Sequence, residues 1–370
     1  MNPDALTTQA LLNCLVREVT APEEQAWEAD GRLMVRLARS GRLLRLGTRR
    51  PSAGPGPRLT GDVALRRADR WVPVGWAELA CLIADELTLA TGVVNEEFGA
   101  QVASSHAAMT AIAAARQARH RAGSAGAGAA GTGSAGAAGS HARTPLAGPV
   151  LDRYLSSEQA LLAGHRFHPA PKARDGDPRE WLPFAPEAAA RFPLRFLAVR
   201  GDVLDADGDA AGLDRLGSPD APAGYHTLPA HPWQLRLLGG RPWLRRAFRD
   251  RLLIDLGAGP RDVIPTSSVR TVYDPAADLF CKFSLNVRIT NCVRKNSWYE
   301  LAGAVALSTL LRPVLADLTA RFPGTALLGE PGYRTVTLAA EEAAEGLSVI
   351  VREGLRGHLT PGALPCWPPP

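Results

Sequence analysis

The segment PTSSVRTVYDPAADLFCKFSLNVRITNCVRKNSWYE, residues 265–300, differs in composition from the rest of the 370-residue chain. The chain carries 42 Lys plus Arg, but only three are lysines, and Lys282 and Lys295 both fall in this segment. Three of the six asparagines fall here as well. Because both residue types are so rare elsewhere, we expect the segment to carry the polar groups of a functional site.

The segment opens with a loop of hydroxyl side chains, in which Ser267, Ser268 and Thr271 surround Arg270. The N–H groups and hydroxyls of such a loop can hold phosphate oxygens, although most loops of this composition are ordinary turns. No Gly-x-x-x-x-Gly-Lys-Ser/Thr motif occurs in the sequence, which excludes a P-loop nucleotidase.

Three further cations follow the loop at intervals of six residues: Lys282, Arg288 and Arg294. Lys282 lies in an expected strand. We expect at least two of the three to reach an anion held by Ser267, Ser268 and Arg270.

Composition and charge narrow the class of protein. Hydrophobic residues at 46% and charged residues at 21% are typical of a soluble globular chain. The net charge of +5 is spread along the chain, so we expect no nucleic-acid partner. Five dispersed cysteines without a CxxC pair predict reduced thiols and a cytoplasmic location. The first residues lack a basic region followed by an uninterrupted apolar core, so we do not expect them to be a signal peptide. No apolar run reaches the roughly 18–20 residues that span a bilayer, so we expect no membrane association.

Hydrophobic periodicity predicts several elements. Residues 31–46 alternate in the manner of a β-hairpin, residues 76–121 have helical spacing, and residues 298–311 form an apolar helix. Residues 122–140 contain only Gly, Ala, Ser and Thr, which cannot form a core, so we expect a disordered surface insertion.

The stretch GHRFHPAPKARDG places His165, His168, Lys172 and Arg174 on a loop stiffened by prolines. Four potential cations suit a polyanion, and a retained lysine in an Arg-rich chain favours a position where a planar guanidinium does not fit. Two alternatives stay open: the histidines cap the preceding helix, or they bind a metal together with His231.

The stretch LPAHPWQ sets His231 close to Trp233. Trp233 as a core anchor with His231 as its hydrogen-bonded neighbour is one interpretation, and a functional histidine is the other. The sequence lacks a nucleophile elbow, a zinc-protease motif and a dinucleotide-binding fingerprint.

Four blocks, GHRFHPAPKARDG, LPAHPWQ, PTSSVRT and CKFSLNVRITNCVR, occur together and in this order. The combination resembles the IucA/IucC family of siderophore synthetases, which work without nonribosomal peptide synthetase machinery. The resemblance implies an α+β fold shaped like a cupped hand, with a helical thumb region and a mixed α/β fingers region. Residues 1–190 would form the thumb-like region, and residues 191–370 the fingers-like region and the start of the palm.

The resemblance also implies the chemistry. Family members use ATP and Mg²⁺ to adenylate a carboxylate of citrate or a similar acid and pass the acyl group to an amine or alcohol. Carried over by position, the catalytic residues would be Arg270, Lys282 and Arg294. The ATP-binding residues would be His168, Lys172, Ser267, Ser268 and Thr271. The acid would contact Ser268, Arg270, Thr290 and Arg294.

One departure concerns the later half of the family's chains, the palm, which carries a motif of His, Gln and Asn and acidic magnesium ligands. Here no Gln-Asn pair follows His358, so we expect the palm to be largely missing and leave the metal ligands unassigned. Two hypotheses result. In the first, the chain is a ligase of siderophore assembly. In the second, it is either a non-catalytic ATP- or carboxylate-binding fragment or one half of a split synthetase. A homodimer, or a partner chain that supplies the palm, would fit the second hypothesis.

Overall fold

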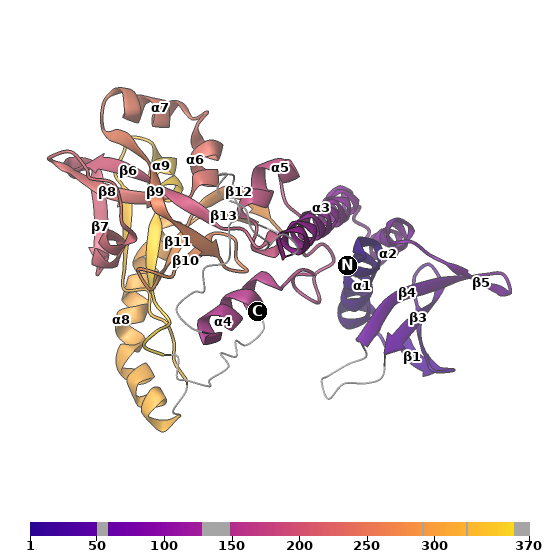
Figure 1. Ribbon diagram of the computed structural model, residues 1–370. Coiled ribbons are helices and arrows are strands. Elements are labelled where there is room, and N and C mark those ends of the chain that lie inside the picture. Colours follow the sequence, from indigo (N-terminus) through magenta and orange to yellow (C-terminus); the bar gives the residue numbers. More distant parts are fainter. Residues whose placement is uncertain (50–57, 128–148, 291, 323–324, 359–370) are drawn as a thin grey trace.

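The computed structural model describes residues 1–49, 58–127, 149–290, 292–322 and 325–358. These residues form two lobes, each built around its own sheet, with a long helix between them (Figure 1). The smaller lobe contains the N-terminus, and the larger one contains residues 265–300.

The N-terminal lobe packs two helices, α1 (Pro3–Cys14) and α2 (Trp76–Thr91), on an antiparallel sheet. The strands follow each other in chain order: β1 (Ala26–Ala29), β2 (Arg32–Arg36), β3 (Leu43–Arg49), β4 (Arg58–Arg67) and β5 (Arg70–Pro73). Leucine and valine side chains on one face of the sheet, such as Val35 and Leu44, are fully buried against these helices. The expected hairpin at residues 31–46 is confirmed by the pairing of Leu33 with Leu46 in β2 and β3.

Helix α3 (Glu96–Ala127) joins the two lobes. Its residue Val102 packs in the core of the N-terminal lobe, whereas Ala108 and Ile112 pack in the core of the larger lobe. The residues expected to be helical, 76–121, form two helices in the structure. The break lies at Gly92, which takes φ +72° and ends α2 with a left-handed cap. Helix α3 continues to Ala127, six residues into the Gly/Ala stretch, whose remainder lies outside the described residues.

The larger lobe is organised by an antiparallel sheet, which has eight strands within the described residues, in the order β7-β14-β15-β11-β10-β9-β6-β8. Their bounds are β6 (Phe192–Arg200), β7 (Leu204–Gly208), β8 (Tyr225–Ala230), β9 (Leu253–Pro265), β10 (Thr271–Asp274), β11 (Leu279–Phe283), β14 (Gly332–Val336) and β15 (Val349–Glu353). A separate hairpin pairs β12 (Leu285–Ile289) with β13 (Cys292–Arg294). The helices of this lobe are α4 (Pro149–Gln159), α5 (Pro178–Trp181), α6 (Pro232–Leu238), α7 (Pro242–Arg249), α8 (Trp298–Arg321) and α9 (Glu341–Gly346).

The two faces of this sheet have different coverings. One face carries the main core, to which Val272, Cys281 and Val351 contribute. The alternate residues point to the other face, where Tyr273 and Phe280 pack with α4. Helix α8 packs on the same face through its first two turns. Because side chains alternate along a strand, Thr271 and Lys282 share the face with α4 and α8.

Helix α8 begins as expected at residue 298 but continues beyond residue 311. By its length and the composition of its most apolar window it could cross a bilayer, but its longest uncharged run, residues 301–311, stays below the roughly 18–20 residues of the expectation. Only 11% of that window is buried, and a single such helix is weak evidence for a membrane span. Leu301 and Val305 attach it to the sheet, whereas Leu310 and Val314 are exposed.

Candidate functional site

The β10–β11 hairpin brings the hydroxyl loop against Lys282. In its register Thr271 lies directly opposite Lys282. The N–H of Phe283 donates to the carbonyl oxygen of Arg270 at 2.9 Å, which extends the pairing into the loop. The last residues of the loop and the first expected cation therefore meet through local hairpin pairing alone.

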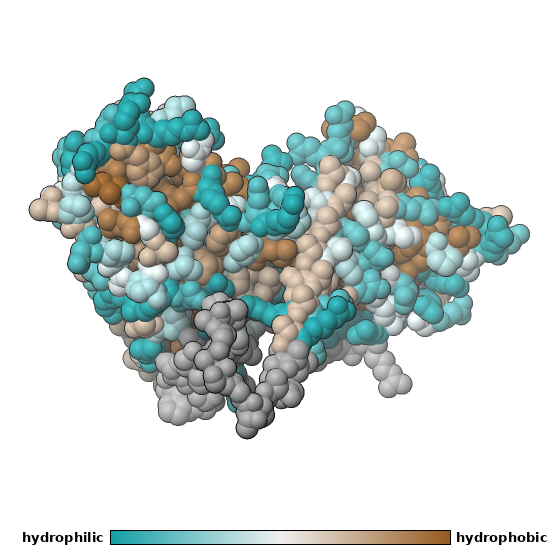
Figure 2. Space-filling model, turned by 45° about the horizontal axis from the view of Figure 1, so that its top comes forward, coloured by the Kyte–Doolittle hydropathy of each residue, from teal (hydrophilic) through white to brown (hydrophobic). Residues whose placement is uncertain are grey.

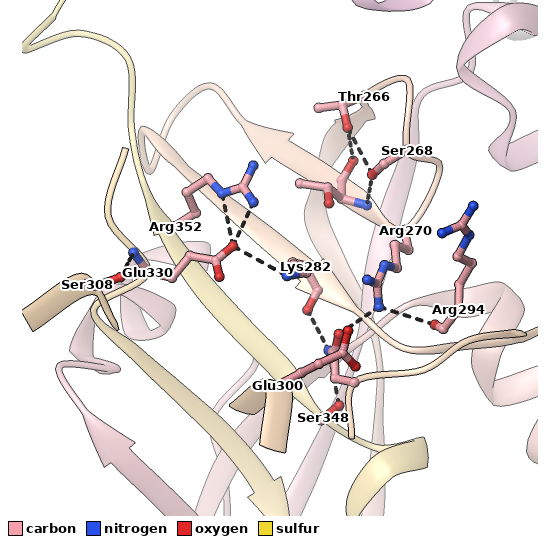
Figure 3. Close-up of polar contacts among 12 residues, drawn as sticks. Thr266, Ser268, Arg270, Lys282, Arg294, Glu300, Ser308, Glu330, Ser348 and Arg352 are labelled. Carbon is pink, nitrogen blue, oxygen red and sulfur yellow. Dashed lines mark hydrogen bonds and ion pairs between the residues drawn. The ribbon is translucent and has the colours of Figure 1, made fainter. Parts of the chain in front are cut away.

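Internal hydrogen bonds fix the conformation of the loop. The N–H and Oγ1 of Thr266 both donate to the carbonyl oxygen of Thr271, at 2.8 and 3.0 Å. The hydroxyl of Ser268 accepts the N–H of Thr271 at 3.1 Å (Figure 3). Val269 takes φ +66°, which is unfavourable for a β-branched residue and is held by these contacts. The loop is thus a preformed turn.

Ser267 shows that the loop accepts an oxyanion. Its N–H and its hydroxyl both donate to one carboxylate oxygen of Glu158, at 2.9 and 2.7 Å. Glu158 comes from α4, more than a hundred residues earlier in the chain. A carboxylate held by a backbone N–H and a hydroxyl has the same acceptor chemistry as a phosphate oxygen.

Arg270 is held by the turn that follows β13. Its Nη1 donates to the carbonyl oxygen of Lys295 at 3.0 Å and to Oδ1 of Asn296 at 2.7 Å. Burial lowers the pKa of the Arg270 guanidinium, while the nearby carboxylate of Glu300 opposes that shift. The guanidinium is therefore oriented by neutral acceptors, and it forms no ion pair within the described residues.

Asn296 is the buried centre of this arrangement and is fully shielded from solvent. Its amide donates to the carbonyl oxygen of Lys282 at 3.1 Å and to Oγ of Ser348 at 3.2 Å. Its own N–H donates to Oγ of Ser284 at 2.7 Å. These bonds join β11, the turn after β13 and β15, which accounts for one of the rare asparagines of the segment.

Lys282 faces an ion pair that the sequence analysis did not anticipate. Glu330 Oε1 lies 3.6 Å from Nζ of Lys282 and accepts two hydrogen bonds from Arg352, at 3.1 and 2.6 Å. Figure 3 shows Glu330 between the two cations. Burial lowers the pKa of the Lys282 ammonium, and the charge of Glu330 opposes that shift. One carboxylate thus balances part of the positive charge at this end of the site.

The β12–β13 hairpin places Arg294 and Thr290 at the other end. Nη2 of Arg294 donates to Oγ1 of Thr290 at 3.1 Å. The N–H of Thr290 donates to the carbonyl oxygen of Ala173 at 2.9 Å, which attaches the hairpin to the segment that follows His168. A cavity of about 320 Å³ lies beside Thr290, between α3 and the backbone of residues 173–175.

Lys172 sits in a different environment from Lys282. Its ammonium donates to Oε1 of Glu187 at 2.6 Å, and Arg174 binds the same oxygen. All three side chains are buried. Burial by itself would raise the pKa of Glu187, but the charges of Arg174 and Lys172 outweigh burial and lower the pKa to about 2. The cluster is therefore ionised, and Lys172 supports the loop from inside, beside the site.

The histidines of the sequence motifs cap short turns. Nδ1 of His168 accepts the N–H of Ala170 at 3.0 Å, and Nδ1 of His231 accepts the N–H of Trp233 at 3.2 Å. His231 is fully buried among aromatic rings, and burial lowers its pKa to about 3. Both observations favour the structural interpretation of His231. Across the described parts of the chain, no group of three His, Cys, Asp or Glu side chains could hold a metal ion.

The expected site residues fall into two sets. The two hairpins and the loop bring together Ser267, Ser268, Arg270, Thr271, Lys282, Thr290 and Arg294. His168 and Lys172 lie in the adjacent segment that contacts Thr290. The sequence analysis missed the contacts of Glu158, Glu330 and Arg352, which come from distant parts of the chain, and those of Asn296, which lies within the segment. For Asn296, the rarity of asparagine was the available signal.

Comparison with known proteins identifies the family. Residues 153–366, more than half of the chain, match the IucA / IucC family. The chain belongs to the IucA/IucC family. The match contains every residue of the loop and the two hairpins, so the site described above lies within the region shared with the family.

Relatives of this IucA/IucC chain include a rhizobactin siderophore biosynthesis protein, RhbC, of Rhizobium meliloti (strain 1021). It is 34% identical over 233 residues, which are 58% of this chain and 40% of the relative. The L-2,3-diaminopropanoate–citrate ligase of Staphylococcus aureus (strain NCTC 8325 / PS 47) is 32% identical over 56% of this chain and 39% of its own length. The matched region thus spans about two fifths of these curated relatives.

Among solved structures, the ATP-bound aerobactin synthetase IucA from a hypervirulent pathotype of Klebsiella pneumoniae superposes with a TM-score of 0.76 at 25% identity. The superposition covers 95% of this chain and 61% of the synthetase. It confirms the expected α+β fold of the IucA/IucC synthetases.

Proposed function

We propose that this chain takes part in siderophore biosynthesis by binding ATP and activating a carboxylic acid, citrate or a close analogue, as an acyl-adenylate. The acyl group then passes to an amine or alcohol. The relatives are named for citrate ligation and siderophore assembly, and one superposed synthetase is ATP-bound. Reduced, dispersed cysteines and the use of ATP agree with a cytoplasmic reaction.

One observation carries the proposal: the loop and the two hairpins bring Ser267, Arg270, Lys282 and Arg294 close together, and Ser267 already holds a carboxylate. In adenylation a carboxylate oxygen attacks the α-phosphorus, and pyrophosphate leaves. Negative charge then grows on the equatorial and the departing oxygens, where fixed donors are most effective. Lys282 and Arg270 would hold the phosphates, because the hairpin and Asn296 fix both beside the loop.

The acid would bind at the opposite end. Thr290 lines the cavity at residues 173–175 and accepts a hydrogen bond from Arg294. A guanidinium can bind a carboxylate by two parallel hydrogen bonds, which orients its attacking oxygen. We therefore assign Thr290 to the acid, Ser268, Arg270 and Arg294 to the boundary between acid and nucleotide, and Ser267, Thr271 and Lys282 to the phosphates. His168 and Lys172 would support this pocket from the adjacent loop.

Magnesium would accompany the nucleotide. Magnesium sites on nucleotides use one or two carboxylates together with phosphate oxygens. Among the carboxylates, Glu300 has the largest effect on the pKa of Arg270. It forms no ion pair within the described residues, so we assign the magnesium ion to it. When bound, magnesium offsets charge on the departing pyrophosphate.

Exchange of labelled pyrophosphate into ATP tests the proposal. We expect exchange that requires an added polycarboxylate and magnesium, with citrate, succinate and 2-oxoglutarate compared side by side. The reverse reaction needs only ATP and the acid, so no amine has to be known. Binding of ATP without acid-dependent exchange would contradict the adenylation step and favour the non-catalytic binding module.

A further inference from the structure

A second cationic cavity lies in the N-terminal lobe, away from the loop and hairpins described above. It has a volume of about 320 Å³ and lies between α1, the adjoining ends of β3 and β4, and the loop at residues 163–166. Its polar lining comprises Gln9, Asn13, Arg49, Arg58, His165 and Arg166. Among the described residues that line it, none is a carboxylate.

Two of these arginines oppose each other directly. Arg49 and Arg58 are register partners in the β3–β4 pair, and like charges in this position destabilise a sheet. Within the described part of the chain, neither forms an ion pair. The same sheet contains a second opposed pair, Arg67 and Arg70. There the repulsion is offset by Glu78, which binds Arg67.

The facing loop is fixed to the same lobe. The ring of Phe167 lies 4.2 Å from the guanidinium carbon of Arg17 and 5.1 Å from that of Arg166. Nδ1 of His165 accepts the N–H of Phe167 at 3.3 Å. These contacts hold the imidazole and the Arg166 guanidinium at the cavity opposite the arginine pair. The first half of the His-rich motif thus turns toward this cavity, whereas Lys172 turns toward Glu187.

We propose that this cavity is a second anion site, which binds a small polyanion with closely spaced phosphate or carboxylate groups. An anion between Arg49 and Arg58 removes their mutual repulsion, as Glu78 does for the other pair. Arg166 adds positive charge from the opposite wall, and His165, whose Nδ1 accepts the N–H of Phe167, has its Nε2–H left to donate to the anion. Arg49 and Arg58 precede the region shared with the IucA/IucC family, and the site is independent of the proposed adenylation.

The test separates this cavity from the central site. Lys282→Ala combined with Arg294→Ala removes two cations of the central site. Pyrophosphate and citrate are then titrated separately into this variant by calorimetry. We expect at least one of the two anions to bind still, and the binding to weaken about tenfold when Arg49→Ala and Arg58→Ala are added, the loss typical of charge-assisted hydrogen bonds.

The matched control is Arg67→Ala with Arg70→Ala in the same background, which removes equal charge from the same sheet. Binding that survives in this control but weakens in the Arg49/Arg58 variant supports the site. Absence of binding for both anions before those arginines are changed would overturn it. Equal affinity with and without Arg49 and Arg58 would overturn it as well. Arg49→Gln with Arg58→Gln removes the charge but keeps part of each side chain, for use if the alanine variant does not fold.

Discussion

Lys172 and Lys282 are two of the three lysines in the chain, and the sequence gives both the same expected role, contact with an anion. The structure places them differently. Lys172 is buried in an ion pair with Glu187, whereas Lys282 is only partly buried, beside the loop. A lysine retained in an Arg-rich sequence indicates a position with a special requirement. The sequence does not show whether the partner of that lysine is a buried carboxylate of the protein or a bound ligand.

Lys172→Ala tests this distinction. In this variant the buried Glu187 carboxylate loses a charge-assisted hydrogen bond and keeps only its pairing with Arg174, so we expect a loss of about 1.5–3 kcal/mol in the free energy of unfolding. Lys282→Ala should cost well under that, because its ammonium keeps some contact with solvent. Urea denaturation of both variants measures the difference. Unchanged stability of the Lys172 variant together with lost ATP binding would place Lys172 in the nucleotide pocket instead.

His231 gives a pH-dependent prediction. Its pKa is about 3 in the folded chain against 6.5 ordinarily, because burial and then the charge of Arg236 disfavour the protonated ring. Below pH 6.5 the unfolded chain therefore binds a proton that the folded chain does not. Stability should fall as the pH drops from about 6.5 toward 3, by up to about 1.4 kcal/mol per unit from this group.

His231→Asn keeps a side-chain acceptor for the turn and removes the titration. We expect the variant to lose less stability than the wild type between pH 6.5 and 4.5, as measured by urea denaturation at each pH. Parallel curves for the two proteins would show that His231 does not titrate in this way.

At the scale of elements, the sequence predicts what local pairing determines. The β2–β3 hairpin, the start of α8 and the proximity of the hydroxyl loop to Lys282 all depend on residues close together in the chain. Contacts across long separations are not readable in this way. Glu158 reaches Ser267 from α4, and Arg352 reaches Glu330 from β15, because tertiary packing and not sequence spacing sets these distances.

Helix α4 carries the contact that most affects ligand entry. Glu158 occupies the N–H and hydroxyl of Ser267, which the proposal gives to phosphate. A phosphate must displace this carboxylate, so Glu158→Gln should tighten ATP binding by about 1 kcal/mol, the net value of such a hydrogen bond. Calorimetry measures it, with Asp152→Asn on the same helix as control. Weaker binding in the Glu158 variant would mean that this carboxylate contacts the ligand favourably.

At the scale of the whole molecule, α3 holds two separate cores together, and hydrophilic side chains cover much of both lobes (Figure 2). The expected division of the chain at residue 190 stays a prediction. Trp181 and Phe184, which precede that residue, pack in the core of the larger lobe. The lobes meet near Thr290 and residues 173–175. Sequence periodicity identifies helices and strands, but it does not show which of two cores each one joins.

The central claim is that the loop and the two hairpins of residues 265–300 bind the nucleotide, and calorimetric titration of ATP into matched variants tests it most directly. Arg288 is the control, because it lies on β12 but is half-exposed and pairs with Glu97 away from the loop and Lys282. We predict that Lys282→Ala and Arg294→Ala each weaken ATP binding by about 1–3 kcal/mol, the range for losing a charge-assisted hydrogen bond, while Arg288→Ala leaves it unchanged. Unchanged affinity in both the Lys282 and the Arg294 variants would contradict the assignment of this site.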